Sequence, residues 1–271
     1  VASSIFYSGG VVPKVAKLPF IQDRDGIPVQ KQYPPGSQNV QIDTIPFTTV
    51  TLPPEQVCRD VTGVFVLLDT SASMAFGNKL PALKAGLNAF TDNLNDESLI
   101  EISTFEQVAV ERIPLGKYGD NKTQVQSVIQ SLVPGPPVGT YSKNAFAFIK
   151  DKIIQGKAAN PNYNFALIFF SDGIPEAVPR TCTPSLCTPQ STNARCFSTD
   201  QDPTLNPDIA REIRNLGVKV YAVALLDQED SCWNDDLSRL MRRVSPNSNK
   251  IANTPEDLVN IYDDIVFELC N

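Results

Sequence analysis

Three short runs of the sequence are apolar at almost every position. Residues 63–68 read GVFVLL, residues 165–170 read FALIFF, and residues 218–226 read VKVYAVALL. A strand with one face in water alternates apolar and polar residues, whereas a continuously apolar strand is buried on both faces. Such strands are typical of a parallel sheet that is covered by helices on both sides, so these runs favour an α/β fold.

Amphipathic segments lie between the apolar runs. Residues 78–94 place Leu80, Leu83, Leu87, Phe90 and Leu94 at helical spacing. Residues 98–113 read as one strand that turns into another. Further helices are predicted over 122–132, 141–154, 206–217, 234–244 and 255–270. This alternation predicts a doubly wound, mostly parallel central sheet with helices on both faces.

The first part of the chain has a different character. Residues 1–57 hold many of the prolines and read as short strands and turns, with no helical pattern. We therefore divide the chain into a Pro-rich, β-strand-containing N-terminal extension, 1–57, and an α/β domain, 58–271.

Composition excludes several classes of function. The net charge is −7 and the pI is about 4.7, which argues against a nucleic-acid partner because phosphate contacts need a basic face. Histidine is absent, so Ser-His-Asp catalysis, Cys-His catalysis and His-ligated zinc are excluded. No stretch reaches the ~20 apolar residues of a membrane span, so we expect no membrane insertion by this chain.

Oxygen-bearing side chains follow two of the apolar strands. Asp69, Ser71 and Ser73 come directly after the first, and Asp172 follows the second. Thr140 follows a loop rich in proline and glycine, at the start of a predicted helix. Ligands of an open α/β sheet bind at the carboxyl ends of its strands, and carboxylates with hydroxyls suit Mg²⁺, Ca²⁺ or Mn²⁺ better than zinc or copper. The alternative is structural, with the serines as helix N-caps and Asp172-Gly173 as a turn.

The motifs at these positions resemble those of a known family. "DTSAS" (69–73) resembles the D-x-S-x-S motif of von Willebrand factor type A (vWA) and integrin I domains, although Ala72 stands where the family often has glycine. "VGT" (138–140) and "FFSDG" (169–173) resemble the family's metal-binding threonine and later aspartate, in the same order along the chain. The resemblance covers residues 58–271.

The resemblance implies a metal-ion-dependent adhesion site. Ser71, Ser73 and Thr140 would bind a divalent cation, Mg²⁺ before Ca²⁺ or Mn²⁺, and Asp69 and Asp172 would bind it directly or through water. The open coordination position would take a carboxylate from a partner. Thr123 and Ser142 are other hydroxyls near the expected position of Thr140.

The function expected from this site is binding, and not catalysis. We expect an extracellular adhesion or protein-interaction domain, on a cell surface or pilus, whose protein or glycan ligand offers a carboxylate. One alternative is a structural surface or pilus subunit with a non-adhesive metal site, and another is an intracellular vWA protein. A metal-dependent hydrolase is a further alternative, but position 71 is serine where aspartate-nucleophile phosphatases have a second aspartate.

The cysteines support an extracellular location. Six cysteines, at 58, 182, 187, 196, 232 and 270, form no C-x-x-C pair, which favours disulfides in an oxidising compartment over unrelated buried thiols. The resembling fold brings its first strand and last helix close together, which implies a Cys58–Cys270 bridge. Among three possible pairings of the others we favour Cys182–Cys187 and Cys196–Cys232. Three of these cysteines lie in an insertion at about 173–205, which we interpret as a specificity loop beside the site.

Overall fold

The computed structural model describes residues 62–176, 198–226 and 231–270. Within them a six-stranded sheet has the order β3-β2-β1-β4-β5-β6. Its strands are β1 (Thr62–Asp69), β2 (Leu99–Phe105), β3 (Ala109–Lys117), β4 (Asn164–Ser171), β5 (Lys219–Leu225) and β6 (Asn249–Ala252). Every neighbouring pair is parallel except β2 with β3, so the sheet is mostly parallel, as the apolar runs predict.

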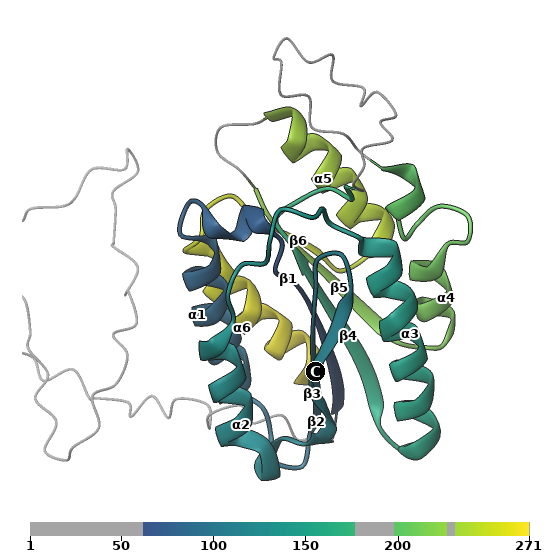
Figure 1. The fold of residues 1–271 in the computed structure, drawn as a ribbon. Helices are drawn as coiled ribbons and strands as arrows, with labels where there is room; N and C mark the ends of the chain where they lie inside the picture. Colours follow the sequence, from purple (N-terminus) through teal and green to yellow (C-terminus); the bar gives the residue numbers. More distant parts are fainter. Residues whose placement is uncertain (1–61, 177–197, 227–230, 271) are drawn as a thin grey trace, which may run out of the picture. The chain divides into compact units, whose positions relative to one another are not determined.

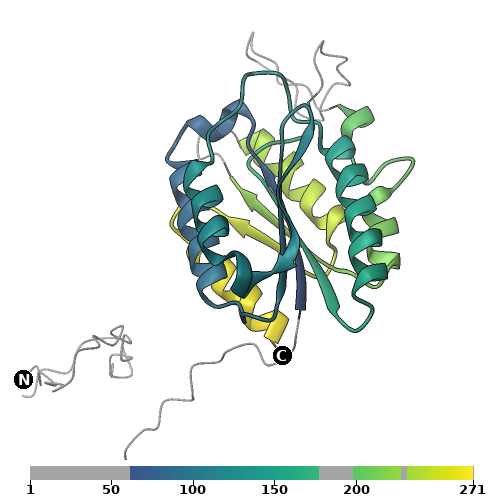
Figure 2. The ribbon, with the colours of Figure 1, turned by 60° about the horizontal axis from the view of Figure 1, so that its bottom comes forward.

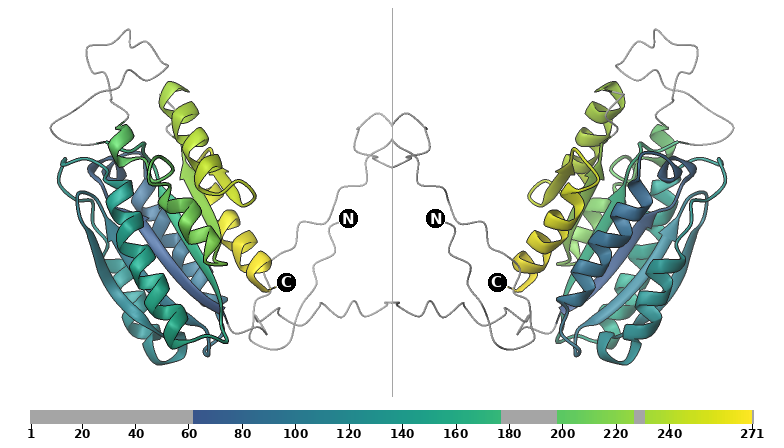
Figure 3. Two further views of the ribbon diagram at one scale, coloured as in Figure 1. Left: turned by 90° about the vertical axis from the view of Figure 1, so that its right-hand side faces the viewer. Right: turned by 90° about the vertical axis from the view of Figure 1, so that its left-hand side faces the viewer.

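Helices cover both faces of the sheet (Figures 1 and 2). They are α1 (Lys79–Asp92), α2 (Tyr118–Ser131), α3 (Ser142–Ala159), α4 (Ile209–Asn215), α5 (Ser231–Val244) and α6 (Asp257–Cys270). One face carries α1, α2 and α6, and the other carries α3, α4 and α5 (Figure 3). The predicted three-layer α/β architecture is therefore confirmed. No helix of the described residues has the length and apolarity to cross a membrane.

The continuous apolar sequence of β1 follows from its central position. All eight of its residues are buried. Val64, Val66 and Leu68 pack into the cluster under α1, α2 and α6, whereas Phe65 and Leu67 pack on the other side. Because successive side chains of a strand point to opposite faces, a strand between two helical layers needs an apolar residue at every position.

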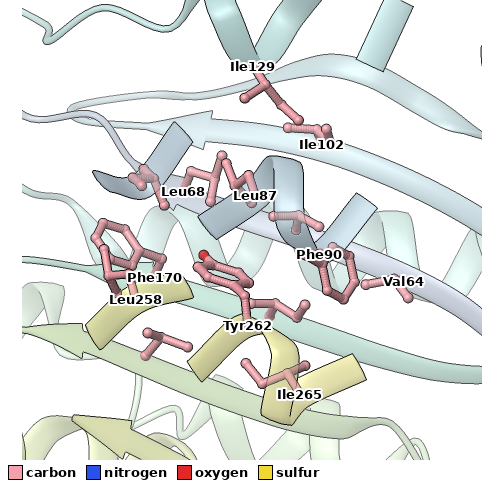
Figure 4. Close-up of a cluster of buried hydrophobic side chains, with 14 of the residues drawn as sticks. Val64, Leu68, Leu87, Phe90, Ile102, Ile129, Phe170, Leu258, Tyr262 and Ile265 are labelled. Carbon is pink, nitrogen blue, oxygen red and sulfur yellow. The ribbon is translucent and has the colours of Figure 1, made fainter. Parts of the chain in front are cut away.

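The last helix packs closely against the first. Gly86 of α1 faces Tyr262 of α6, and a Cβ atom at position 86 would lie 2.6 Å from the Tyr262 ring. The same ring lies 6.1 Å from that of Phe90, in the cluster shown in Figure 4. The apolar positions predicted for both helices are all buried. They are Leu80, Leu83, Leu87, Phe90 and Leu94 for the first, and Leu258, Ile261, Tyr262, Ile265 and Val266 for the last.

The structure adds details that the sequence patterns do not predict. The edge strand β6 is only four residues long, which is too short for a periodic pattern. The chain after β1 forms a short 3-10 helix, η1 (Ala72–Ala75), and a second, η2, spans Thr199–Gln201. The proposed extension 1–57, most of the insertion at 173–205 and all six cysteine side chains lie outside the described residues.

Candidate metal centre

The carboxylate of Asp69 lies at the carboxyl end of β1 and is fully buried. Its Oδ1 accepts a hydrogen bond of 2.8 Å from the backbone N–H of Ser71, and its Oδ2 accepts one of 2.6 Å from the Ser171 hydroxyl. Ser171 is the last residue of β4, which pairs with β1. The carboxylate is thus fixed by groups from two adjacent strand ends.

The two serines of the D-x-S-x-S motif converge through a helical turn. Ser71 directly precedes η1 and Ser73 lies within it, and their hydroxyl oxygens are 3.0 Å apart. Ser73 also donates a hydrogen bond of 2.8 Å to Oδ1 of Asp172. Ser71 occupies the N-cap position of η1, but its side chain makes no capping hydrogen bond, so the capping alternative does not explain it.

Asp172 follows β4 and is fully buried. While Ser73 holds its Oδ1, its Oδ2 lies 2.9 Å from Nζ of Lys79, a side chain that is itself only 8% exposed. The structure therefore brings four of the five predicted residues into one hydrogen-bonded group: Asp69, Ser71, Ser73 and Asp172. It also adds Lys79 and Ser171, which the sequence analysis did not single out.

Thr140 lies in the segment that borders this group. It is buried, its N–H donates to the Glu176 carbonyl at 2.8 Å, and its carbonyl accepts from the Glu176 N–H at 3.0 Å. This pairing places Thr140 beside the chain that leaves Asp172. Of the two alternative hydroxyls, Thr123 is exposed on α2. Ser142 is buried, and its hydroxyl has no hydrogen-bond partner in the described part of the chain, so it remains the alternative to Thr140.

The electrostatics of the group fit a cation. Burial, with a smaller contribution from the nearby Asp172, raises the pKa of Asp69 to about 7, although the hydrogen bonds from Ser171 and Ser71 oppose the shift. Two buried carboxylates that disfavour each other's charge are stabilised when a positive ion lies between them. Ser73 donates its hydroxyl hydrogen bond to Asp172, so Ser71 is the donor in the contact between the two serines, and one lone pair of the Ser73 oxygen remains to face a metal. The described residues contain no cluster of three or more His, Cys, Asp or Glu side chains suited to a metal, so a cation here would be held by two carboxylates and by hydroxyls.

A comparison with protein families finds a match. Residues 64–174, which include all five predicted site residues, match the model of the von Willebrand factor type A domain. The thrombospondin-related anonymous protein of Plasmodium berghei (strain Anka) is 31% identical over 134 residues, which are 48% of this chain and 22% of that protein. The chain thus spans less than a quarter of the length of this curated relative.

Solved structures share the fold at low sequence identity. The pilus adhesin SpaC from Lactobacillus rhamnosus GG superposes with a TM-score of 0.59 at 17% identity, over 78% of this chain and 31% of that one. The proximal thread matrix protein 1 of the mussel byssus, with a zinc-occupied MIDAS motif, gives a TM-score of 0.56 at 17% identity, over 78% of this chain and 48% of that one. These similarities show that the described residues have the vWA fold.

Proposed function

We propose that this vWA domain is an extracellular adhesion module that binds an acidic group of a partner through a divalent cation. Asp69, Ser71, Ser73, Thr140 and Asp172 would hold the cation, with Mg²⁺ as the first candidate and Ca²⁺ or Mn²⁺ as the others. The observation that carries the proposal is the convergence of two buried carboxylates and two hydroxyls at adjacent strand ends.

The chemistry of the residues supports binding over catalysis. Hydroxyl oxygens are neutral, so a cation held largely by them keeps much of its positive charge and remains attractive to an outside carboxylate. The chain has no histidine to act as a general base near neutral pH. A domain that presents a cation to an acidic ligand needs neither a nucleophile nor a base.

The exposed apolar side chains at this edge of the sheet favour a protein ligand over a glycan. Phe76, Val108 and Val133 are 69%, 64% and 70% exposed, and we call them the apolar rim. They lie after η1, between β2 and β3, and after α2. Backbone hydrogen bonds join these three loops, from Gly135 to Thr70 at 2.7 Å and from Tyr141 to Glu106 at 2.8 Å. An acidic side chain flanked by apolar neighbours would match both the cation and the rim.

An extracellular location is supported by two independent features. The six cysteines suit an oxidising compartment. Among similar proteins, one is named sporozoite surface protein 2, from Plasmodium yoelii yoelii, and another is a pilus adhesin. We propose that this domain, like them, works at a surface.

The test is a binding screen of the whole chain against arrays of extracellular proteins and of glycans. Each array is probed in Mg²⁺, in Ca²⁺, in Mn²⁺ and in EDTA. The proposal predicts at least one protein whose binding is lost in EDTA and restored by Mg²⁺. Binding that is equally strong in EDTA would contradict a role for the cation, and cation-dependent hits confined to the glycan array would contradict the choice of a protein ligand.

Phe76→Ala is expected to weaken binding to such a protein by about tenfold, because an interface that buries a phenylalanine gains roughly 1.5–3 kcal/mol from it. Surface plasmon resonance in saturating Mg²⁺ measures the change. The control is Phe267→Ala, which removes a phenylalanine that is 59% exposed near the end of α6. In Figure 1 this end of α6, marked C, lies at the opposite edge of the sheet from η1, which follows β1. Equal losses in the two variants would remove the apolar rim from the interface.

A further inference from the structure

A lysine side chain is buried within the candidate cation site. Lys79 is the first residue of α1, is 7% exposed, and places Nζ 2.9 Å from Oδ2 of Asp172. Gly77 and Asn78 both adopt left-handed backbone conformations just before it, with φ of 61° and 59°, and so turn the chain from η1 into α1. A lysine is almost never so deeply buried unless it is paired, and here its partner is a proposed metal-binding carboxylate.

The position of Lys79 leaves the rest of the site in place. Asp172 receives Lys79 on Oδ2 and Ser73 on Oδ1, so the ammonium and the hydroxyl occupy different oxygens of one carboxylate. Asp69 is held by Ser71 on Oδ1 and by Ser171 on Oδ2. The ammonium therefore does not take the place of the hydroxyl that would face a cation.

The Lys79 ammonium changes the net charge of the site that an incoming cation, and then an incoming carboxylate, encounters. Asp69 and Asp172, when ionised, give the site a charge of about −2, and Lys79 reduces this to about −1. A divalent cation then brings the loaded site to about +1, whereas without Lys79 it would be neutral. A neighbouring positive charge repels a cation and attracts a carboxylate, and both effects are large where water is excluded.

We propose that Lys79 sets the relative affinities of this site for its two ligands. It weakens the binding of the cation by the site and strengthens the binding of an acidic group by the cation-loaded site. The inference rests on the function proposed above and adds a specificity-determining residue to it. The competing view is that Lys79 and Asp172 form only a structural ion pair, which the same experiment excludes or supports.

The decisive variant is Lys79→Met, which keeps a long unbranched side chain and removes the charge. Calorimetric titration of the metal-free protein with Mg²⁺ is expected to show at least about tenfold tighter binding in the variant. Acetate titrated into the Mg²⁺-saturated protein, followed by NMR of the backbone amides, is expected to bind at least about tenfold more weakly.

Thermal unfolding adds a readout that does not depend on any partner. In EDTA the variant is expected to unfold at a lower temperature than the wild type, because a buried carboxylate has lost its counter-charge. Saturating Mg²⁺ is expected to raise the unfolding temperature of the variant by more than that of the wild type, because tighter ligands stabilise more. A merely structural ion pair would cost the same stability in both conditions.

Two further variants serve as controls. Lys84→Met removes the same charge from the same helix, where the ammonium donates to the Gln130 carbonyl at an exposed position; its Mg²⁺ and acetate affinities are expected to stay within about twofold of the wild type. Lys79→Arg keeps the charge and is expected to keep both affinities near wild-type values. If Lys79→Met does not fold, as judged by circular dichroism, Lys79→Gln carries the same expectations.

The outcomes separate this inference from the proposed function. A wild type that binds Mg²⁺, with Lys79→Met binding it no more tightly, would overturn the role of Lys79 and leave the cation site standing. A wild type that binds no divalent cation would overturn both.

Discussion

Asp69→Ala is expected to abolish measurable Mg²⁺ binding while leaving the fold intact. Asp69 is fully buried, and its carboxylate fixes the N–H of Ser71 and the hydroxyl of Ser171. Its removal takes away one of the two negative charges at the site. It also removes the acceptor that fixes the backbone N–H of Ser71, at the start of the turn that carries both serines. Losing a charge next to a divalent cation in a buried site is expected to weaken binding at least about a hundredfold.

The fold is expected to survive because this carboxylate is not a source of stability in the metal-free protein. Burial raises its pKa to about 7, so the folded state disfavours the charged form, and deleting the group removes that penalty along with two hydrogen bonds. The far-UV circular dichroism spectrum should therefore match that of the wild type. Saturating Mg²⁺ should raise the unfolding temperature of the wild type and leave that of the variant unchanged.

The matched control for this experiment is Asp151→Ala, which removes an exposed aspartate from α3. Calorimetry should give this variant the Mg²⁺ affinity of the wild type. If Asp69→Ala retained undiminished Mg²⁺ affinity, the assignment of the metal centre to the ends of β1 and β4 would be wrong.

Much of the fold could be predicted because a strand that is buried on both faces has an apolar residue at nearly every position. The strands β1, β4 and β5 read as unbroken apolar runs, since each lies between other strands and under two helical layers. The edge strand β6 has only one neighbour and four residues, so nothing in its sequence separates it from a loop. The hydrophobic pattern of the sequence thus predicts the central strands of this sheet better than the edge strand β6.

The candidate site could be predicted to the extent that its residues follow strand ends. Asp69 and Asp172 are predictable as site residues because they stand at the carboxyl ends of two strands, and parallel strands bring these ends together. Lys79 lies ten residues beyond Asp69, the last residue of β1, at the start of a helix, and reads as an ordinary surface lysine. Its burial depends on the turn through Gly77 and Asn78. Glycine and asparagine mark such a left-handed turn in the sequence, but they do not show that the turn brings Lys79 to Asp172.

A buried acid outside the site was also hidden from sequence reasoning. Glu101 lies in the middle of β2 and is 0% exposed. It shares a strand face with Leu99 and Phe105, which pack on the α3 side of the sheet. Ser103 donates a hydrogen bond to its Oε1, and Oε2 has no hydrogen-bond partner among the described residues. Burial, with a smaller contribution from Glu111, raises the pKa of Glu101 to about 8, although the Ser103 hydrogen bond and the charge of Lys152 oppose the shift.

The raised pKa makes Glu101 a cost to stability at neutral pH. Below the pKa of about 4.5 that the residue has in the unfolded chain, both states are protonated and there is no cost. Between pH 4.5 and 8 the unfolded chain has released a proton that the folded protein keeps, so the free energy of unfolding falls as pH rises. At one pKa unit per ~1.4 kcal/mol, the cost approaches roughly 3 kcal/mol at pH 7.

Glu101→Gln is therefore expected to stabilise the protein, by about 1–3 kcal/mol at pH 7 and by almost nothing near pH 4. The amide has the size of the protonated carboxyl, keeps an acceptor for the Ser103 hydroxyl and cannot ionise. Urea unfolding between pH 4.5 and 8 measures the gain in the free energy of unfolding.

Because Asp69 titrates in both proteins, the difference in stability between wild type and variant isolates the contribution of Glu101. The control, Glu97→Gln, alters an exposed glutamate paired with Lys117 at 2.6 Å and should change stability by less than about 1 kcal/mol. A stability difference for Glu101→Gln that does not grow with pH would show that this carboxyl is ionised in the folded protein, and that the α3 side of the sheet stabilises its charge.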